Sequence, residues 1–455
     1  MKTVNVLLWF DVEDYITKES DDALYGLLEL LDSLSIKGTF KIVGQKVRRL
    51  EENRRDDIFA RLNNHGIGFH TDLHSYHPTV SEYLEAYGFR DGVQKFEATE
   101  LPGLQSLQKR VSKTARCYGQ AGYSWAPQAF PTLRHWGLPV YLDCHDQVRL
   151  DGVPFWYGGV LNLTDIRATM RMELEEGGLD KAIQVFDKHH QVRLDDGGFI
   201  SIFYHPCEFA TKEFWDGHNY ALGVNTPKEQ WRIPPLRSGE EMKHYLEMLG
   251  EFLRYTLTKE QVRYITADEA LALAHAPQVS LGDEEIREIA ADVGQDLYFT
   301  VHNHKSISAS DLFMLFYKYL CKQPFPAEML YGPEQHVDSD FVGSVKVRDI
   351  IQAISSDRCA YPSIYLDKQL PDAFTVAGQR VNPVDMACTL AYIIAHDLSE
   401  EDSVAIVKGT LKSAQHAKKE VLWGPKWVVF PPEFTAPNIV SLSELQTWTL
   451  KPALF

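Results

Sequence analysis

The chain has 455 residues, of which 44% are hydrophobic and 24% charged, and its formal net charge is −17. These proportions are those of a soluble globular protein, and the length exceeds one ordinary core, so we expect two or three domains. The acidic balance argues against nucleic acid and anionic membranes as partners, because both require basic patches on the protein.

The N-terminal residues and the cysteines set an expectation for location. The apolar run at 4–10 is too short for a secretory signal and is followed at once by acids. No apolar run approaches the roughly 20 residues that span a bilayer. The six cysteines are scattered and form no Cys-x-x-Cys pair. We therefore expect a cytoplasmic protein with reduced thiols and no membrane partner.

Strands and helices alternate in the first part of the chain. Apolar runs typical of buried strands occur at 4–10, 37–43, 66–69, 115–118, 139–142, 156–163, 199–204 and 262–265. Helical stretches separate most of them, and this alternation predicts a mostly parallel sheet or barrel. Residues 215–238 show no periodicity, as is typical of a loop that covers a substrate.

The pattern changes after Ala276-Pro277. Short amphipathic helices are expected at 283–293, 308–322, 347–355, 382–396 and 400–419, with short strands at 297–301 and 374–376. We therefore predict one domain at 1–276 and a smaller, mixed but mainly helical domain at 277–455. Ser308 and Asn382 each open a helix with a cap and an acid, which hints at an internal duplication.

Three histidines directly follow the predicted strand at 66–69: His70, His74 and His77. A spacing of four residues sets His70 and His74 on one side of a helical turn, where both can reach one metal ion. The chain has 17 histidines, so such a pair also arises by chance. The hypothesis of a metal site therefore needs support from other parts of the sequence.

Acids supply that support at the end of the first predicted strand, where Asp11, Glu13 and Asp14 follow the apolar run. Burying three acids is costly unless they bind a cation or take part in catalysis. Asp11 and Glu13 share a face if the strand continues, whereas Asp14 would belong to the loop. We therefore prefer Glu13 to Asp14 as the third metal ligand.

Asp11, His70, His74 and His205 all stand at the ends of predicted strands, and residues 1 to about 275 resemble the polysaccharide deacetylase family, the NodB-homology carbohydrate esterases. Phe10-Asp11-Val-Glu13-Asp14 resembles the first motif of that family. His70-Thr-Asp-Leu-His74 fits the second motif, H-[ST]-x-x-H, and Ser201-Ile-Phe-Tyr-His205-Pro resembles the last. The resemblance implies a distorted (β/α)7 barrel and metal-dependent removal of an acetyl group from an N-acetylated sugar.

The resemblance also implies roles for these residues. Asp11 would be the catalytic base and His205 the acid, while His70 and His74 with Glu13 or Asp14 would hold one divalent metal ion. Two neutral histidines and one carboxylate suit Zn²⁺ best, with Co²⁺ or Fe²⁺ as alternatives.

Two motifs of this chain depart from the family. The third motif normally presents an arginine in R-x-P-x-G, but Arg116 is followed by Cys-Tyr-Gly-Gln, so either Arg116 or Gln120 could take that place. Leu142-Asp143-Cys-His-Asp146 resembles the fourth motif without its tryptophan. Asp146 or Asp143 is therefore the candidate that would orient the histidine or the arginine.

Candidates for binding the substrate follow less directly. A backbone N–H near Tyr118 and Gly119 could stabilise an oxyanion. Trp125, Trp156 and Trp215 could stack on a sugar ring, although each could equally be a core residue. The predicted substrate is a small sugar or glycan precursor, and the sequence predicts no oligomeric state. Two alternatives stay open: hydrolysis of another carbon–nitrogen bond on the same barrel, and an inactive barrel with a binding or scaffold role.

Part of the second domain carries its own resemblance. Residues 369–383, Gln-Leu-Pro-Asp-Ala-Phe-Thr-Val-Ala-Gly-Gln-Arg-Val-Asn-Pro, resemble a pseudomurein-binding-type repeat. This resemblance implies a module for binding or assembly.

Overall fold

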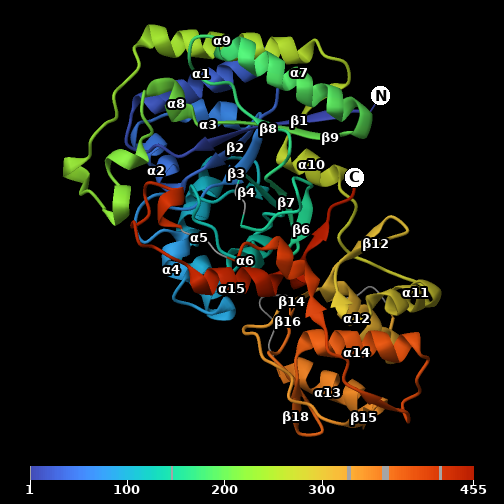
Figure 1. The fold of residues 1–455 in the computed structure, drawn as a ribbon. Helices are drawn as coiled ribbons and strands as arrows, with labels where there is room; N and C mark the ends of the chain where they lie inside the picture. The colour runs from blue at the N-terminus through green and yellow to red at the C-terminus, as the bar shows by residue number, and fades with distance from the viewer. Residues whose placement is uncertain (1, 145–146, 325–328, 361–367, 420–422) are drawn as a thin grey trace.

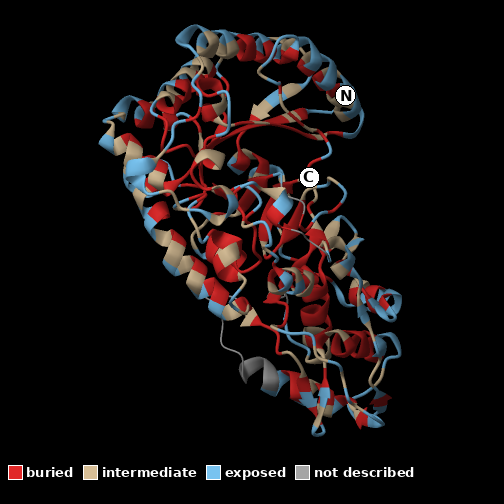
Figure 2. Cartoon of the chain, turned by 60° about the vertical axis from the view of Figure 1, so that its left-hand side comes forward, coloured by how far each residue is buried: buried red, intermediate tan, exposed pale blue. Residues whose placement is uncertain are grey.

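The computed structural model describes residues 2–144, 147–324, 329–360, 368–419 and 423–455. A larger α/β region, built mostly from the first 275 residues, lies beside a smaller region of helices and short strands (Figure 1). In the larger region buried residues fill the central strands, and in both regions they line one face of the helices (Figure 2).

One curled sheet organises the larger region. In the described residues it has eleven strands in the order β21-β6-β7-β5-β4-β3-β2-β1-β9-β8, with β10 paired to the first half of β1. The strands are β1 (Val4–Val12), β2 (Thr39–Ile42), β3 (Gly66–Phe69), β4 (Cys117–Tyr118), β5 (Val140–Asp143), β6 (Phe155–Tyr157), β7 (Val160–Thr164), β8 (Thr169–Met170), β9 (Gly198–Tyr204), β10 (Val262–Ile265) and β21 (Lys451–Pro452). All neighbouring strands between β7 and β8 in this order pair in parallel. The pairs β6 with β7 and β21 with β6 are antiparallel. The predicted distorted barrel of parallel strands is confirmed.

β1 lies inside this sheet because its sequence is apolar on both faces. Every residue from Val6 to Val12 is buried. Phe10 stacks on Phe40 of β2 at 4.6 Å, and on the other face Trp9 stacks on Phe203 of β9 at 5.1 Å. A parallel strand covered on both faces reads as a continuous hydrophobic run, as predicted.

Helices cover the outside of the sheet with one apolar face each. In α1 the buried residues Leu24, Leu27, Leu28 and Leu31 follow helical spacing. The helices of this region are α1 (Glu19–Ser33), α2 (Gly44–Glu52), α3 (Asp56–Leu62), α4 (Val80–Leu84), α5 (Phe89–Arg110), α6 (Ala129–His135), α7 (Gly178–Asp196), α8 (Pro206–Ala210), α9 (Gly239–Leu257) and α10 (Ala267–Leu273). Residues 211–238 form only short 3-10 turns, in keeping with the predicted loop.

The smaller region contains one structural unit twice, which confirms the duplication suggested by Ser308 and Asn382. Each unit is a helix, a two-stranded antiparallel hairpin and a second helix. The units are α11 (Asp283–Val293), β12 (Thr300–His302), β13 (Lys305–Ile307) and α12 (Ala309–Leu320), then α13 (Val347–Ala360), β17 (Phe374–Val376), β18 (Gln379–Val381) and α14 (Pro383–Ala395). Ser308 and Asn382 accept hydrogen bonds from the backbone N–H groups of Asp311 and Asp385, at 3.1 and 2.8 Å.

The helix expected at 400–419 is wrong. β19 (Ser403–Ala405) pairs antiparallel with β15 (Ser344–Lys346), and β20 (Thr410–Leu411) pairs with β11 (Asp296–Leu297). The N–H of Gly409 donates to the buried carboxylate of Asp385 at 2.8 Å. These long-range pairings hold 403–405 and 410–411 extended and override the helical periodicity, and Lys412–His416 forms a 3-10 turn. The remaining short pair is β14 (Leu330–Tyr331) with β16 (Lys368–Gln369).

The end of the chain returns to the larger region. After α15 (Pro437–Gln446), β21 extends the main sheet by pairing with β6 (Figure 1). Trp423, Phe430, Ile439 and Leu450 belong to the same core as β1. The last part of the expected 277–455 domain therefore shares the core of the first.

Two further findings concern membrane-spanning helices and the cysteines. In the described residues, helices are either too short or too polar to cross a membrane. The five cysteines whose side chains are described are all free thiols.

Candidate metal centre

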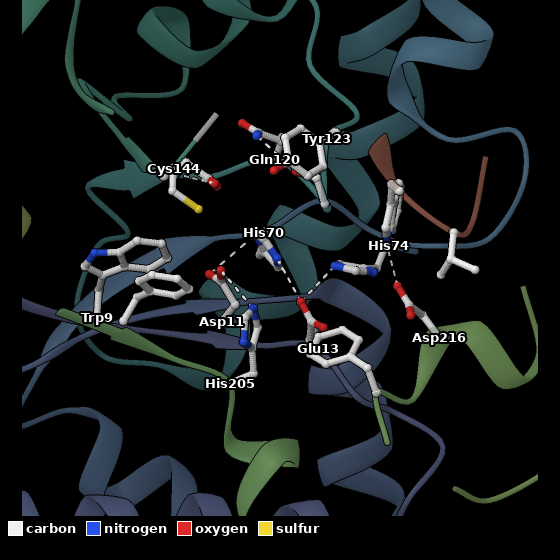
Figure 3. Close-up of a pocket in the computed structure, with 16 residues that line it drawn as sticks. Trp9, Asp11, Glu13, His70, His74, Gln120, Tyr123, Cys144, His205 and Asp216 are labelled. Carbon is white, nitrogen blue, oxygen red and sulfur yellow. Dashed lines mark hydrogen bonds and ion pairs between the residues drawn. The ribbon is translucent and has the colours of Figure 1, made fainter. Parts of the chain in front are cut away.

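The candidate site lies where the parallel strands end. Asp11 and Glu13 come from the end of β1, His70 follows β3, and His205 follows β9. Carboxyl ends of parallel strands meet at one edge of a sheet, which is where α/β enzymes place their chemistry. Figure 3 shows these side chains converging on one cavity, whose volume is about 350 Å³.

Three side chains form a compact group of potential metal ligands: Glu13, His70 and His74, all buried. The Nδ1 of His70 donates to the carbonyl oxygen of Gly119 at 2.9 Å, which turns its Nε2 toward Glu13. The Oε2 of Glu13 lies 3.3 Å from that nitrogen and 2.8 Å from the Nε2 of His74. Its Oε1 accepts a hydrogen bond from the indole of Trp215 at 2.8 Å.

This group fits a divalent metal ion. The Nε2 of His74 is buried and lies 2.8 Å from the Oε2 of Glu13, but this contact lacks hydrogen-bond geometry, so a metal ion could join the two atoms in place of a proton. The three ligand atoms lie within 4.8 Å of one another, and imidazole with carboxylate is a donor set that zinc accepts. Burial alone would raise the pKa of Glu13, but the histidines around it hold that pKa well below its usual value. Glu13 is therefore an anion ready to bind a cation.

The two histidines meet without the expected helical turn. Thr71 and His74 have positive φ angles of 63° and 55°, so the chain from His70 to His74 is an irregular bend. Their rings nevertheless lie 5.1 Å apart. A β-branched residue such as Thr71 rarely adopts this conformation, and such strain is found mostly at functional sites.

Lys41 of β2 is the cation beside Asp11, and it was not anticipated from the sequence. Its Nζ lies 2.9 Å from Asp11 and 3.1 Å from Asp143, and it donates to the carbonyl oxygen of Leu142 at 2.7 Å. Burial alone would lower the pKa of Lys41, but Asp11 and Asp143 together raise it. The available signal was a lysine inside an apolar strand, between Phe40 and Ile42.

Gly119 allows Lys41 to reach this position. A Cβ at Gly119 would lie 2.1 Å from the Nζ of Lys41 and 2.6 Å from the Oδ2 of Asp143. Any larger residue at position 119 would therefore displace the ammonium group.

The predicted oxyanion donors Tyr118 and Gly119 are not placed for that role. The N–H of Gly119 already donates to the carbonyl oxygen of Phe69 at 3.2 Å, because β4 continues the sheet there. The Tyr118 ring points into the core, 5.3 Å from the ring of Tyr141. Gly119 acts at this site through its carbonyl group and its lack of a side chain.

His205 lies beside Asp11 at the cavity, because β9 is the neighbour of β1 in the sheet. Its Nε2 lies 3.7 Å from the Oδ2 of Asp11, and its Nδ1 lies 3.2 Å from Glu208. Arg171 donates to the other oxygen of Glu208 at 2.6 Å. Burial alone would lower the pKa of His205, but Glu208, Glu13 and Asp11 raise it to about 9. The imidazolium form is therefore present at neutral pH and can donate a proton.

Two other predicted site residues, Asp14 and Arg116, do not line the cavity. Asp14 turns away, and its Oδ1 accepts hydrogen bonds from the N–H groups of Ile16 and Thr17, both at 2.9 Å. The side chain of Arg116 pairs with Asp268 at 3.0 Å, away from the residues that line the cavity. Asp146 lies outside the described residues, and Asp143 is the acid of that motif that reaches Lys41.

The predicted aromatic platform consists of different residues. Trp125 and Trp156 are buried in the core and do not line the cavity, because their rings cover strands of the sheet. Trp215 is also fully buried and holds Glu13. The aromatic residues that do line the cavity are Trp9, Tyr123, Phe203, Phe214 and Trp427.

No known family model and no curated protein matches the sequence. Among solved structures, a putative polysaccharide deacetylase from Mycobacterium smegmatis aligns with a TM-score of 0.39 and 16% identity over 60% of this chain and 89% of that chain. Puue allantoinase aligns with a TM-score of 0.38 and 12% identity over 58% and 88%. The Xyl-CE4 domain of a multidomain xylanase from the hindgut metagenome of Trinervitermes trinervoides aligns with a TM-score of 0.32 and 9% identity. This alignment covers 60% of this chain and 91% of that chain. At these identities the likeness is one of fold alone.

Proposed function

We propose that the chain is a metal-dependent hydrolase of amide carbon–nitrogen bonds that removes the N-acetyl group of an amino sugar or glycan precursor. One observation carries this proposal: the Glu13, His70 and His74 group, an acid held by a lysine, and a protonated histidine all face one cavity. Metal-assisted amide hydrolysis requires such a metal site, a general base and a general acid at one cavity.

Glu13, His70 and His74 would hold the divalent ion, for which Zn²⁺ is our first choice and Co²⁺ or Fe²⁺ the alternatives. When bound, such an ion acidifies water and polarises an amide carbonyl group. The hydrogen bonds from His70 to Gly119 and from Trp215 to Glu13 orient two of these ligands before any ion binds.

Asp11 and His205 would move the protons. Lys41 fixes the Oδ1 of Asp11 at 2.9 Å, which leaves Oδ2 directed toward His205 and the cavity. Asp11 can therefore accept a proton from the attacking water. His205 would protonate the leaving amine, because Glu208 and Arg171 hold its ring in place and Glu208 favours the imidazolium form.

The apolar wall of the cavity favours a second candidate, hydrolysis of an amide that is not part of a sugar. Trp9, Phe203 and Phe214 line the cavity. The phenylalanines have no polar atom, and the indole N–H of Trp9 already donates to Ser201 at 2.9 Å. Both candidates use the same catalytic groups. They differ in the part of the substrate attached to the amide nitrogen, which is a sugar in the first candidate and another group in the second.

A calorimetric titration of zinc into metal-stripped protein tests the metal centre. We expect one tight site, and we expect the His70→Ala/His74→Ala double variant to lose it. His336→Ala is the matched control, because the side chain of His336 is 71% exposed and remote from the cavity lining. Absence of a site in the parent protein would refute the mechanism and favour an inactive barrel. With zinc bound, release of acetate from N-acetylglucosamine oligomers then tests the reaction.

A further inference from the structure

The wall of the catalytic cavity includes a segment from the far end of the chain. Trp427 and Val428 line the cavity together with residues of the barrel. The carbonyl oxygens of Val428 and Val429 accept hydrogen bonds from the N–H groups of Leu222 and Gly223, both at 2.9 Å. The segment is therefore fastened to the loop at 211–238 by its backbone.

Trp427 is seated beside a metal ligand. Its indole nitrogen donates to the Oδ2 of Asp216 at 2.9 Å, and its ring meets the ring of His74 edge-on at 5.7 Å. A Cβ at Gly122 would lie 2.4 Å from the Trp427 ring, so the ring uses the space that this glycine leaves open. These contacts on three sides fix the orientation of Trp427 in the wall.

The wall around the catalytic groups is mostly apolar. Tyr123, Phe214 and Val428 line the cavity and are also 38%, 37% and 54% exposed, so they form its mouth. Tyr123 and Gln120 lie across the cavity from Asp11 and His205 (Figure 3). An exposed apolar surface that continues into a cavity is typical of a ligand-binding site.

Besides the catalytic groups, the polar side chains of the wall are Gln120, Tyr123, Asp143, Cys144 and Asp216. Tyr123 and Cys144 are exposed, and Asp143 is paired with Lys41. The other two, Gln120 and Asp216, are already bonded. Gln120 accepts from Tyr141 at 2.6 Å and donates to the carbonyl oxygen of Gly122 at 3.0 Å. Asp216 accepts from Trp427 and, at 3.3 Å, from Ser75. A sugar would bring several hydroxyl groups into the cavity, and each buried hydroxyl without a partner costs binding free energy. An apolar group instead gains by leaving water here.

We propose that the segment around Trp427 is part of the substrate site, and that the substrate carries an apolar, flat group beside the scissile amide. This inference rests on the amide hydrolysis of the proposed function, and the apolar cavity wall selects its second candidate, an amide that is not part of a sugar, over the first. An acetylated aromatic amine represents the class. In this arrangement Trp427 and Val428 determine specificity, and the C-terminal part of the chain is needed for binding.

Equilibrium binding to the zinc-loaded Asp11→Asn full chain tests this inference, with acetanilide and N-acetylglucosamine as probes. Acetanilide should bind about tenfold more tightly, since burial of an aromatic ring is worth more than that factor requires. Val428→Asp should weaken acetanilide binding about tenfold without changing zinc affinity, because the charge must leave water when the ring enters. Val428 is exposed, so this variant should fold, and Trp427→Ala should act in the same direction.

Val342→Asp is the matched control, because it adds the same charge at a valine that is 80% exposed and outside the cavity lining. It should leave both dissociation constants unchanged. Tighter binding of the sugar, or unchanged acetanilide binding in Val428→Asp, would overturn the inference and leave amide hydrolysis standing. Binding as expected, with no acetate released from either compound by the parent protein, would instead overturn the proposed function and leave the binding site standing.

Discussion

Buried carboxylates occur in both regions of the molecule, and they are used differently. In the smaller region, Asp385 is satisfied by its own surroundings: it accepts hydrogen bonds from Ser339, Asn382, Lys408 and the N–H of Gly409. In the larger region, Glu13 is directed toward two imidazoles that face a cavity, and its 2.8 Å contact with the Nε2 of His74 lacks hydrogen-bond geometry. Burial of an acid is therefore a poor sign of function, whereas convergence of incompletely satisfied groups on a cavity is a good one.

The largest difference should appear when one acid of each kind is changed. Asp11→Asn should lower the turnover number for amide hydrolysis about 1,000-fold, because a positioned base typically contributes 10²–10⁴-fold. Its zinc affinity should change little, since Asp11 is not among Glu13, His70 and His74. Asp385→Ala should leave turnover unchanged and lower the free energy of unfolding by about 2 kcal/mol, because it strands buried donors.

Turnover, zinc calorimetry and urea unfolding of the two variants provide the measurements. A loss of turnover in folded Asp385→Ala comparable to that in Asp11→Asn would contradict the distinction between the two kinds of acid.

A pair of buried lysines in the larger region sharpens the comparison. Lys41 contacts Asp11 at the cavity, whereas Lys46 joins Asp21 at 2.6 Å and the carbonyl oxygen of Asp14 at 2.5 Å, away from the cavity lining. Breaking either buried ion pair should lower the free energy of unfolding by about 3 kcal/mol or more. Only Lys41→Met should also lower the turnover of the folded protein, by about 100-fold, because a displaced base costs that much.

The readouts are turnover per folded molecule and its pH profile, measured for Lys41→Met, Lys41→Arg and Lys46→Met. Equal turnover in Lys41→Met and Lys46→Met would show that Lys41 is structural only.

Glu100 of α5 is intermediate between the two kinds of acid, because it is buried near the site without facing the cavity. It accepts hydrogen bonds from the N–H of Asp72 at 2.6 Å and from the hydroxyl of Tyr83 at 3.0 Å. Burial is the main cause that raises its pKa from 4.5 to about 7. The folded state thus binds a proton that the unfolded state releases near pH 4.5, so stability should fall as the pH rises from about 4.5 through 7.

Glu100→Gln should remove most of this pH dependence. The penalty that it relieves at pH 8 is at most about 3 kcal/mol, from the size of the pKa shift. Urea unfolding at pH 5 and pH 8 measures it, with Glu284→Gln on the surface of α11 as the control. A parent protein whose unfolding free energy rises from pH 5 to pH 7 by the same amount as that of Glu100→Gln would contradict the assignment.

The sequence predicted the features that depend on local patterns, and it missed those that depend on contacts between residues far apart in the chain. The run at 4–10 identified β1, and strand ends brought Asp11, His70, His74 and His205 to one edge, because carboxyl ends of parallel strands converge. We preferred Glu13 to Asp14 as the third ligand because alternate residues of a strand share a face, which puts Glu13 on the same face as Asp11.

The residues that were missed act across the fold. Lys41 meets Asp11 because the register of β1 and β2 places them side by side, and no local pattern reports that pairing. Trp427 reaches the cavity from more than 350 residues beyond His74, after the chain has passed through the smaller region. The core position of Trp125 and Trp156 depends on which face of the sheet each one covers, which the aromatic composition does not determine.

The smallest effect is expected at Arg116, which the sequence motif suggested as a catalytic group. Its side chain is 41% exposed and pairs with Asp268, which is 54% exposed, and such pairs contribute less than about 1 kcal/mol. Arg116→Ala should therefore change turnover and zinc affinity by less than about twofold, within the range of a neutral surface substitution. Lys41→Met is its counterpart, because Lys41 supplies at Asp11 the positive charge that the motif led us to expect from Arg116. A turnover loss in Arg116→Ala as large as that in Lys41→Met would place an arginine at the base in solution and would refute the arrangement of the cavity described above.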